Sequence, residues 1–347
     1  MKISSNIINY KSSVKEVLER IEIIKSSSKS LFVVNDNLQI QGTVTDGDIR
    51  RGFIAGHTID DELEKFINKD FISIRNIDSP KIINEAKKKG IKLLPMVDED
   101  NKIKKIYDLS KLKALLPVDA VIMAGGRGKR LRPLTDNIPK PLLPLGNKSI
   151  IEHNINRLIS FGVENIYITV NYLANQIIET LGDGSSRGIN IQYVKEDTPL
   201  GTAGALSLIK KFKHKYVILM NSDLFTDINF YDLYDELISK NADIAVSSIP
   251  YSIDIPFAVF KKRNSNIIDI QEKPQLNYYA NAGIYLFNIK ILEFIPENIK
   301  YDATDLISDV IKSGKKVIDS PITGYWIDIG RHEEYNKAKE IVKHITK

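Results

Sequence analysis

Short apolar runs alternate with amphipathic segments along the C-terminal two thirds of the chain. The predicted helices cover residues 150–161, 202–212, 303–312 and 333–344. The predicted strands cover residues 165–170, 189–194 and 216–220. Strands separated by helices are typical of a mainly parallel sheet that is covered by helices on both faces. We therefore expect an α/β domain over residues 118–347, with ligands at the carboxyl ends of its strands.

The first third of the chain repeats its own pattern. A strand, an acidic turn and a second strand occur in residues 30–49 and again 63 residues later. The matched residues are Val34 with Val97, Asp36 with Glu99, Ile40 with Ile103 and Ile49 with Leu112. Each copy is predicted to form helix, strand, turn, strand and helix, and two copies can bury their apolar faces against each other. We expect a smaller α/β module over residues 1–117, divided into about 1–60 and 61–117.

Composition and charge narrow the classes of protein. The chain has 347 residues, of which 43% are hydrophobic, and no apolar run approaches the ~20 residues of a membrane-spanning helix. The N-terminus shows no apolar signal region, and the chain contains no cysteine, which excludes disulfides and thiolate metal sites. A net charge of +5 is too small to indicate nucleic-acid binding. We therefore expect a cytoplasmic protein that binds neither nucleic acid nor membrane.

The segment from Asp119 to Pro144 carries the clearest chemistry. A buried strand is predicted over residues 120–124, and it leads into a turn with glycines at positions 125, 126 and 128. Glycine lets the backbone bring its amide groups close to an anion. Four cations follow at positions 127, 129, 130 and 132, and Lys140 lies between two prolines. A glycine turn alone is common, but with these cations it indicates a polyphosphate site.

The pattern continues through R-L-R-P-L-T and P-K-P-L, and the whole segment resembles the signature of the sugar-1-phosphate nucleotidyltransferases. These enzymes transfer a nucleoside monophosphate from an NTP to a sugar-1-phosphate and release pyrophosphate. The resemblance implies a Rossmann-like sheet, with Arg130 on the β- and γ-phosphates and Lys140 on the α-phosphate. Lys129 departs from the family, which usually has Thr or Ser there. The nucleotide would also contact the backbone at Ala124, Gly125 and Gly126.

Two acidic residues are candidates for a magnesium site. Asp223 follows the predicted strand 216–220, and Asp328 lies in a W-I-D-I-G segment. Both positions resemble the metal ligands of the family, and Mg²⁺ prefers one or two carboxylates together with phosphate oxygens. An Asp after a strand can instead cap a helix, and Asp227 is expected to cap a helix that starts near Asn229. The five histidines have no spacing that indicates a metal site.

Residues 195–205, K-E-D-T-P-L-G-T-A-G-A, resemble the base-reading loop of the family. Glu196 stands where uridylyl- and thymidylyltransferases usually have Gln, and Gly201 belongs to the same nucleotide-binding element. A carboxylate can accept two parallel hydrogen bonds from guanine N1–H and the exocyclic amine, whereas an amide fits a pyrimidine edge. We therefore expect GTP as the nucleotide. A surface role for Glu196 beside Asp197 is the alternative.

Residues 270–274, I-Q-E-K-P, resemble the element that binds the sugar-1-phosphate. The resemblance implies that Glu272 binds sugar hydroxyls and that Lys273 neutralises the acceptor phosphate and takes part in catalysis. The predicted sugar site is completed by Asn281 and Gly283 in the following N-A-G-I-Y segment. Ala258 stands where relatives usually have Gly, so the shape of the acceptor can differ. An E-K pair is otherwise a common surface dipeptide.

The N-terminal repeat resembles a tandem pair of CBS domains, which often bind adenine nucleotides and regulate an attached enzyme. In the T-V-T-D-G-D-I motif of the first copy, Thr45 would bind a phosphate and Asp48 the ribose hydroxyls. The second copy departs from this motif, because Asp108 and Lys111 occupy the two positions. A purely structural or dimerising role is the alternative. CBS pairs often associate between subunits, so we expect a homo-oligomer.

The complete chain most resembles one branch of the family. The order of a CBS pair followed by a transferase domain, together with Glu196, favours the glucosamine-1-phosphate guanylyltransferases of legionaminic acid biosynthesis. Mannose- and heptose-1-phosphate guanylyltransferases come next. A uridylyl- or thymidylyltransferase of the same fold is an alternative. A catalytically silent nucleotide sensor is another, although such a protein has no physical reason to keep Arg130, Lys140, Asp223 and Asp328.

Overall fold

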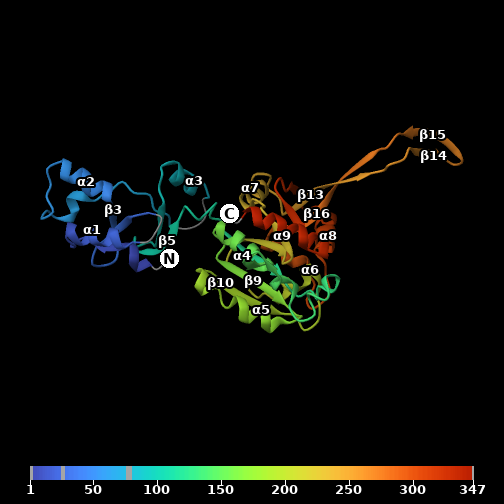
Figure 1. Ribbon diagram of the computed structural model, residues 1–347, viewed down its shortest axis with the longest axis horizontal. Helices are drawn as coiled ribbons and strands as arrows, with labels where there is room; N and C mark the ends of the chain where they lie inside the picture. The colour runs from blue at the N-terminus through green and yellow to red at the C-terminus, as the bar shows by residue number, and fades with distance from the viewer. Residues whose placement is uncertain (1–2, 25–27, 76–79, 346–347) are drawn as a thin grey trace. The chain divides into compact units, whose positions relative to one another are not determined.

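The computed structural model describes residues 3–24, 28–75 and 80–345. They form two compact units (Figure 1), which are described separately below. The N-terminal unit comprises residues 1–116 and 160–162, and the C-terminal unit comprises residues 117–159 and 163–347. Within the described ranges, no helix is both long enough and apolar enough to cross a membrane.

The N-terminal unit contains two small sheets, one with the strand order β1-β2-β3 and one that pairs β4 with β5. Its elements are β1 (Ile7–Asn9), α1 (Val14–Ile23), β2 (Ser30–Val34), β3 (Ile40–Thr45), α2 (Asp46–Ile54), η2 (Leu63–Phe66), α3 (Pro80–Lys88), β4 (Leu93–Val97) and β5 (Ile103–Asp108). Ser13 and Glu16 form a reciprocal cap at the start of α1, because each side chain accepts a hydrogen bond from the other residue's backbone amide. The first sheet and α1 enclose an apolar core.

The β2–β3 and β4–β5 hairpins correspond element by element at a spacing of 63 residues. Both are antiparallel, and each has an irregularity in its pairing at the same point, beside Val34 and Val97. Their turns contain residues with left-handed backbone at equivalent places, Leu38 (φ 63°) and Asn101 (φ 61°). The final helix expected in the second copy is wrong, since residues 109–117 form turns and irregular structure. The next strand, β6 (Val118–Met123), begins too soon after β5 for a helix and its connections.

The C-terminal unit is built on a seven-stranded sheet with the order β10-β9-β6-β11-β16-β13-β17. Besides β6, these strands are β9 (Asn165–Val170), β10 (Asn190–Lys195), β11 (Tyr216–Asn221), β13 (Ile244–Asp254), β16 (Gln275–Asn288) and β17 (Val317–Pro321). Strands β10, β9, β6 and β11 are parallel neighbours, whereas β16 runs antiparallel to β11 and β13. The expected mostly parallel α/β sheet is therefore confirmed.

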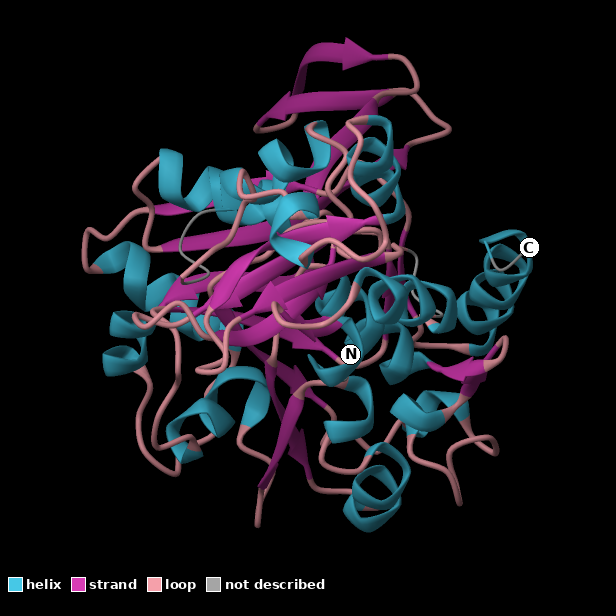
Figure 2. Ribbon diagram, turned by 90° about the vertical axis from the view of Figure 1, so that its left-hand side faces the viewer, coloured by secondary structure: helices cyan, strands magenta, loops and turns pink. Residues whose placement is uncertain are grey.

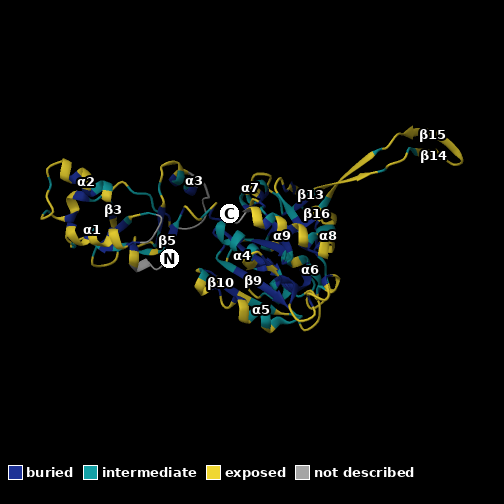
Figure 3. Ribbon diagram, viewed as in Figure 1, coloured by how far each residue is buried: buried dark blue, intermediate teal, exposed yellow. Residues whose placement is uncertain are grey.

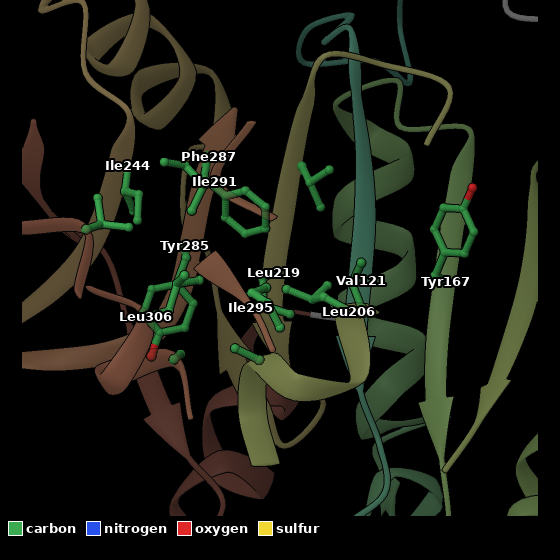
Figure 4. Close-up of a cluster of buried hydrophobic side chains, with 14 residues drawn as sticks. Val121, Tyr167, Leu206, Leu219, Ile244, Tyr285, Phe287, Ile291, Ile295 and Leu306 are labelled. Carbon is green, nitrogen blue, oxygen red and sulfur yellow. The ribbon is translucent and has the colours of Figure 1, made fainter. Parts of the chain in front are cut away.

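Helices pack beside these strands (Figure 2). They are α4 (Ile150–Ser160), α5 (Ala174–Leu181), α6 (Gly201–Gly204), α7 (Phe230–Ser239), α8 (Ala303–Lys312) and α9 (His332–Ile345). Figure 4 shows Leu206 and Leu306 near the sheet residues Val121, Leu219 and Tyr285, with which they form one buried apolar cluster. Burial of such side chains, at about 25 cal/mol for each Å² removed from water, stabilises the unit.

Two local expectations are wrong. The predicted helix 202–212 ends earlier, as α6 followed by a 3₁₀ turn over Ala205–Leu208. The loop that follows is held at its far end, where the amides of Lys213 and His214 donate to the buried carboxylate of Asp119 (2.6 and 3.0 Å). Asp227 does not cap α7. Asn229 does, because its side-chain oxygen accepts a hydrogen bond from the amide of Tyr231 (3.1 Å).

A long two-stranded ribbon projects from the sheet, and we call residues 249–280 the arm. The outer half of β13 pairs with the first half of β16, and β14 (Val259–Arg263) pairs with β15 (Asn266–Gln271) at the far end. Figure 1 shows β14 and β15 well outside the sheet, and Figure 3 shows that the ribbon is almost entirely exposed. No residue of the arm is buried.

Candidate active site

An ion pair between Lys140 and Asp223 lies at the carboxyl edge of the sheet. Lys140 is the first residue of a 3₁₀ turn, Lys140–Leu142, and Asp223 lies two residues after the end of β11. The ammonium group of Lys140 donates to Asp223 Oδ2, and the Lys140 side chain is only 10% exposed. Pro139 and Pro141 restrict the backbone on both sides of Lys140. Lys140 of the sequence motif and Asp223 near the strand end were expected to act together, and the structure places them in contact.

Asp328 is placed beside Asp223 by a short two-stranded sheet. Strand β18 (Trp326–Asp328) pairs with β12 (Leu224–Thr226), so that Asp328 lies opposite Leu224. The amide of Ile329 also donates to the carbonyl of Asp223 (3.0 Å). Burial raises the pKa of the Asp328 carboxyl group, and the negative charge of Asp223 raises it further. The positive charges of Lys140 and Arg130 oppose this rise, so Asp223, Lys140 and Arg130 each lie within electrostatic range of Asp328.

The two carboxylates are suited to a divalent cation. Asp223 Oδ1 and Asp328 Oδ1 are both buried, and neither has a hydrogen-bond partner among the described residues. An unpaired buried carboxylate oxygen is costly unless a ligand satisfies it. In the part of the chain that the structure describes, no cluster of three or more His, Asp or Glu residues could form a protein-only metal cage. Two carboxylates fit Mg²⁺, which usually takes its other ligands from water and phosphate oxygens.

The glycine-rich loop is folded tightly against Lys140. Gly128 has left-handed backbone (φ 59°), and a Cβ there would lie 3.0 Å from the Lys140 Cβ and from Thr135 Cγ2. The Thr135 hydroxyl donates to the carbonyl of Gly128 (2.8 Å), which fixes this turn. Arg130 points toward the segment after Asp328, since a Cβ on Gly330 would lie 3.3 Å from its guanidinium. Lys129, the residue that departs from the family pattern, is exposed.

A cleft of about 300 Å³ opens beside this cluster. Its lining includes the predicted residues Gly125, Gly126, Lys140, Glu196, Gly201 and Asp223. Glu196 Oε2 accepts a hydrogen bond from the amide of Leu200 (3.0 Å), and the side chain of Asn171 donates to the Glu196 carbonyl (2.7 Å). A Cβ on Gly125 would lie 3.0 Å from Glu196 Oε1, so the missing side chain leaves room for this carboxylate. Ala124 is buried behind the loop.

Two further predicted glycines permit close contacts. A Cβ on Gly201 (φ 78°) would lie 2.6 Å from Asp302 Oδ1, so this glycine allows α6 to dock against the start of α8. A Cβ on Gly283 (φ 70°) would lie 2.6 Å from the amide nitrogen of Asn221, which lines the cleft. Asn281 stabilises this bend, because its side-chain oxygen accepts from the amide of Gly283 (2.9 Å).

Glu272 and Lys273 are not brought into the cleft. Both lie on the arm, both are exposed, and no arm residue lines the cleft. Conversely, the cleft includes Asn171 and Asn221, which the sequence reasoning missed. Each follows a correctly predicted strand, and a polar residue directly after a buried strand is the signal that could have identified it.

The N-terminal unit has a second, larger cleft of about 730 Å³. Thr45 and Asp48 both line it, together with four cations, Lys29, Arg51, Lys89 and Lys92. The amide and hydroxyl of Thr45 donate to Asp48 Oδ2 (2.8 and 2.6 Å), and Arg51 pairs with Asp48 Oδ1. The two predicted residues therefore form the cap of α2, with cations facing the same space.

Comparison with known sequences gives matches that cover about three fifths of the chain. The chain is similar to the mannose-1-phosphate guanylyltransferase catalytic subunit beta of Dictyostelium discoideum, with 32% identity over 226 residues that cover 62% of each chain. It is also similar to the bifunctional protein GlmU of Methanocaldococcus jannaschii, with 33% identity over 221 residues, 62% of this chain and 52% of that one. The chain thus spans between about half and three fifths of the length of these relatives.

Solved structures share the fold of about two thirds of the chain. The structure of HddC from Yersinia pseudotuberculosis complexed with GMP-PN superposes with a TM-score of 0.51 and 25% identity, covering 65% of this chain and 99% of that one. The family model described as "Nucleotidyl transferase" matches residues 119–344. This match covers more than half of the chain and includes the glycine-rich loop, Lys140, Asp223 and Asp328. The protein belongs to the nucleotidyl transferase family.

Proposed function

We propose that the protein is a cytoplasmic sugar-1-phosphate guanylyltransferase, which forms a GDP-sugar and pyrophosphate from GTP and a sugar-1-phosphate. The observation that carries this proposal is the group formed by Lys140 and Asp223, which line a cleft in a nucleotidyltransferase fold, and Asp328, which senses the charges of Lys140, Asp223 and Arg130. The reaction needs positioning and charge neutralisation rather than a protein nucleophile. Two cations and two carboxylates supply those needs.

The proposed reaction is an in-line displacement at the α-phosphorus of GTP. A phosphate oxygen of the sugar-1-phosphate attacks that phosphorus, and the bond to the bridging oxygen of the β-phosphate breaks as pyrophosphate leaves. Lys140 binds the α-phosphate, and Arg130 binds the β- and γ-phosphates. Asp223 and Asp328 would hold Mg²⁺, which supplies positive charge against the triphosphate.

Glu196 supports GTP as the nucleotide. It lines the cleft, and Oε1 faces Gly125 while Oε2 is held by the amide of Leu200. Carboxylate oxygens fit the two adjacent donors of guanine better than an amide does. The similarity to a mannose-1-phosphate guanylyltransferase agrees with this choice. A uridylyl- or thymidylyltransferase is the second candidate.

Glucosamine-1-phosphate, or a related hexose or heptose phosphate, is the proposed acceptor. The proposal assigns its hydroxyls to Glu272 and its phosphate to Lys273. Gly283 and Asn281 would shape the floor beneath the sugar, because they set the position of Asn221 in the cleft.

We further propose that the N-terminal unit is a tandem CBS module that binds an adenine nucleotide. Its cleft combines four cations with the apolar residues Phe71, Ile72 and Ile91, which suits a phosphate at one end and a base at the other. Calorimetric titration with AMP, ADP and ATP tests this role. Binding that is lost in an Arg51→Ala variant would support it, and no heat with any of the three would contradict it.

A matrix of nucleotides and acceptors tests the catalytic proposal. GTP, ATP, UTP and dTTP are each combined with glucosamine-, glucose-, mannose- and heptose-1-phosphate, and pyrophosphate release is measured. We expect release with GTP and one of these acceptors. Turnover with UTP or dTTP alone would contradict the guanine assignment, and no release in any combination would favour a silent nucleotide sensor.

A further inference from the structure

The arm has one apolar side and one polar side. In the section nearer the sheet, Tyr251 lies opposite Tyr278 and Ile253 lies opposite Leu276, and cross-strand partners share a face. On the other side, the Ser252 hydroxyl donates to Asn277 Oδ1 (2.6 Å), and the side-chain amide of Gln275 donates to Asp254 Oδ1 (2.9 Å). Pro250 lies opposite Tyr279 at the inner end of this mostly polar side. This alternation is typical of strands that bury one face.

The far section repeats this arrangement. Phe260 lies opposite Ile270 on one face, whereas Lys261 lies opposite Asp269 on the other. The apolar side chains are nevertheless open to solvent, with Tyr251 54%, Phe260 49% and Ile270 59% exposed. An isolated two-stranded ribbon is marginally stable in water, and an exposed apolar surface of this kind marks an interface.

The exposed area is sufficient for a stable protein contact. Ten large apolar side chains of the arm are exposed: Tyr251, Ile253, Phe257, Phe260, Ile267, Ile268, Ile270, Leu276, Tyr278 and Tyr279. Covering them would bury on the order of 1000 Å² of the arm, and a standard interface buries about 800 Å² on each partner. Two arms exchanged symmetrically would double this contact.

The cleft itself lacks a cation for a second phosphate. Lys140 is the single Lys or Arg among the described residues that line it, and its ammonium group already faces Asp223. Lys273 is exposed on the arm. Strands β13 and β16 stay paired from Ile249 to Asp254, and the Ile255 amide donates to the carbonyl of Pro274 (3.1 Å), so the arm is one continuous ribbon that carries Lys273 outward beyond Asp254.

We propose that two copies of this chain exchange arms, so that Glu272 and Lys273 of each copy complete the cleft of the other. Lys273 of one protomer then binds the acceptor phosphate beside Lys140 and Asp223 of its partner. This inference rests on the proposed function for the role of Lys273. The exchange itself rests on the exposed arm, which has an apolar and a polar side, and on the incomplete cleft. In a closed symmetric pair, each arm would be covered by the partner chain.

Complementation between two defective variants tests the exchange through activity. Asp223→Asn removes a cleft carboxylate and keeps the arm, whereas Lys273→Ala keeps the cleft and alters the arm. Each variant alone is expected to lose at least ~100-fold in pyrophosphate release. The two are co-expressed with different affinity tags, and mixed pairs are isolated through both tags.

Mixed pairs are expected to recover about half of the wild-type rate, because one of the two clefts has its carboxylate and also receives an intact Lys273. Pairs of Asp223→Asn with Asp328→Asn are the control. Both changes lie in the cleft, so neither cleft is intact and no activity should return. If Asp223→Asn with Lys273→Ala stays inactive while the wild type is active, the exchange is contradicted.

Cross-linking tests the exchange without any activity. The natural chain has no cysteine, so single cysteines can be placed at will. Pro199 is exposed and lines the cleft. Co-expressed Lys273→Cys and Pro199→Cys chains, treated with a short bismaleimide, are expected to give a peptide that joins the two positions. The exchange would be overturned if the mixture gave no such peptide while the Lys273→Cys/Pro199→Cys double variant gave a cross-link within one chain. This result does not depend on which reaction the enzyme catalyses.

Discussion

The side chains of Lys140 and Asp223 form an ion pair although 83 residues separate them in the chain. The pair joins the segment after the glycine-rich loop to the end of β11, and it holds the proposed phosphate-binding cation and the proposed metal-binding carboxylate side by side. In the proposed reaction both groups act on the same triphosphate. Removal of either charge should therefore affect catalysis more than folding.

Asp223→Asn should lower kcat/KM by about 100- to 1000-fold, because the amide keeps the shape of the side chain but removes the charge that would hold the cation. Asp328→Asn should behave alike. Pyrophosphate release measures the loss, and circular dichroism shows whether the fold is kept. The exposed Asp232→Asn on α7 is the matched control and should stay within twofold of wild type. Wild-type turnover in Asp223→Asn would exclude this metal site.

Glu196→Gln should shift the choice of base. The amide would not form the charge-assisted hydrogen bonds that the carboxylate accepts from the two guanine donors. We therefore expect kcat/KM for GTP to fall by about 10- to 100-fold and kcat/KM for UTP to fall less. Parallel assays with both nucleotides give the ratio. Asp197→Asn, an exposed neighbouring change, should leave the ratio unaltered. An unchanged ratio in Glu196→Gln would mean that Glu196 does not contact the base.

Gly283→Ala should damage the cleft as well as the fold. The added methyl group would lie 2.6 Å from the Asn221 side chain, and the residue would also have to keep a φ of 70°. We expect a loss of about 1–3 kcal/mol in unfolding free energy. Gly314→Ala separates the two effects, because Gly314 has a φ of 80° but no atom within 4 Å of the added carbon. Gly314→Ala should lower the unfolding free energy and leave kcat/KM unchanged. Equal kcat/KM in the two variants would contradict the proposal that Asn221 shapes the cleft.

Asp119→Ala should destabilise the C-terminal unit by about 3 kcal/mol, because it removes the buried acceptor of three hydrogen bonds. Asp119 is fully buried and contacts the amides of Lys213 and His214 and the His214 ring nitrogen Nδ1 (2.8 Å). Urea denaturation measures the change. Glu340→Ala, which removes an exposed pair with Lys343 on α9, should leave the urea midpoint nearly unchanged. Equal costs would show that the Asp119 contacts do not stabilise the fold.

Most of the C-terminal unit could be predicted from periodicity. The strand over residues 165–170 and the helix over 303–312 have the predicted bounds, since an apolar run and an amphipathic segment each fix their own structure locally. The segment after Leu208 could not be predicted, because Asp119 on a distant strand binds its amides. The cap of α7 could not be predicted with certainty of position either. Asp227 and Asn229 both precede the helix, but only Asn229 lies directly before its first residue, Phe230.

The site could be predicted in part. The motifs identified the loop, both acids and Glu196, because each follows a strand or lies in a dense signature. Asn221 was missed, since its role depends on the bend at Gly283 in another strand. The placement of Glu272 and Lys273 could not be predicted for a different reason. Their motif indicates what the two side chains bind, but the length of the paired strands β13 and β16 determines where those side chains lie.

In the proposed reaction, Lys140, Asp223 and Asp328 hold GTP and a cation for attack by a sugar-1-phosphate. The most direct measurement follows the products of wild-type protein with GTP and glucosamine-1-phosphate by ³¹P NMR, with Mg²⁺ and with excess EDTA. We predict equal amounts of a GDP-sugar and pyrophosphate with Mg²⁺, and neither with EDTA. Formation of GDP and inorganic phosphate instead, or the same yield with EDTA, would contradict the account.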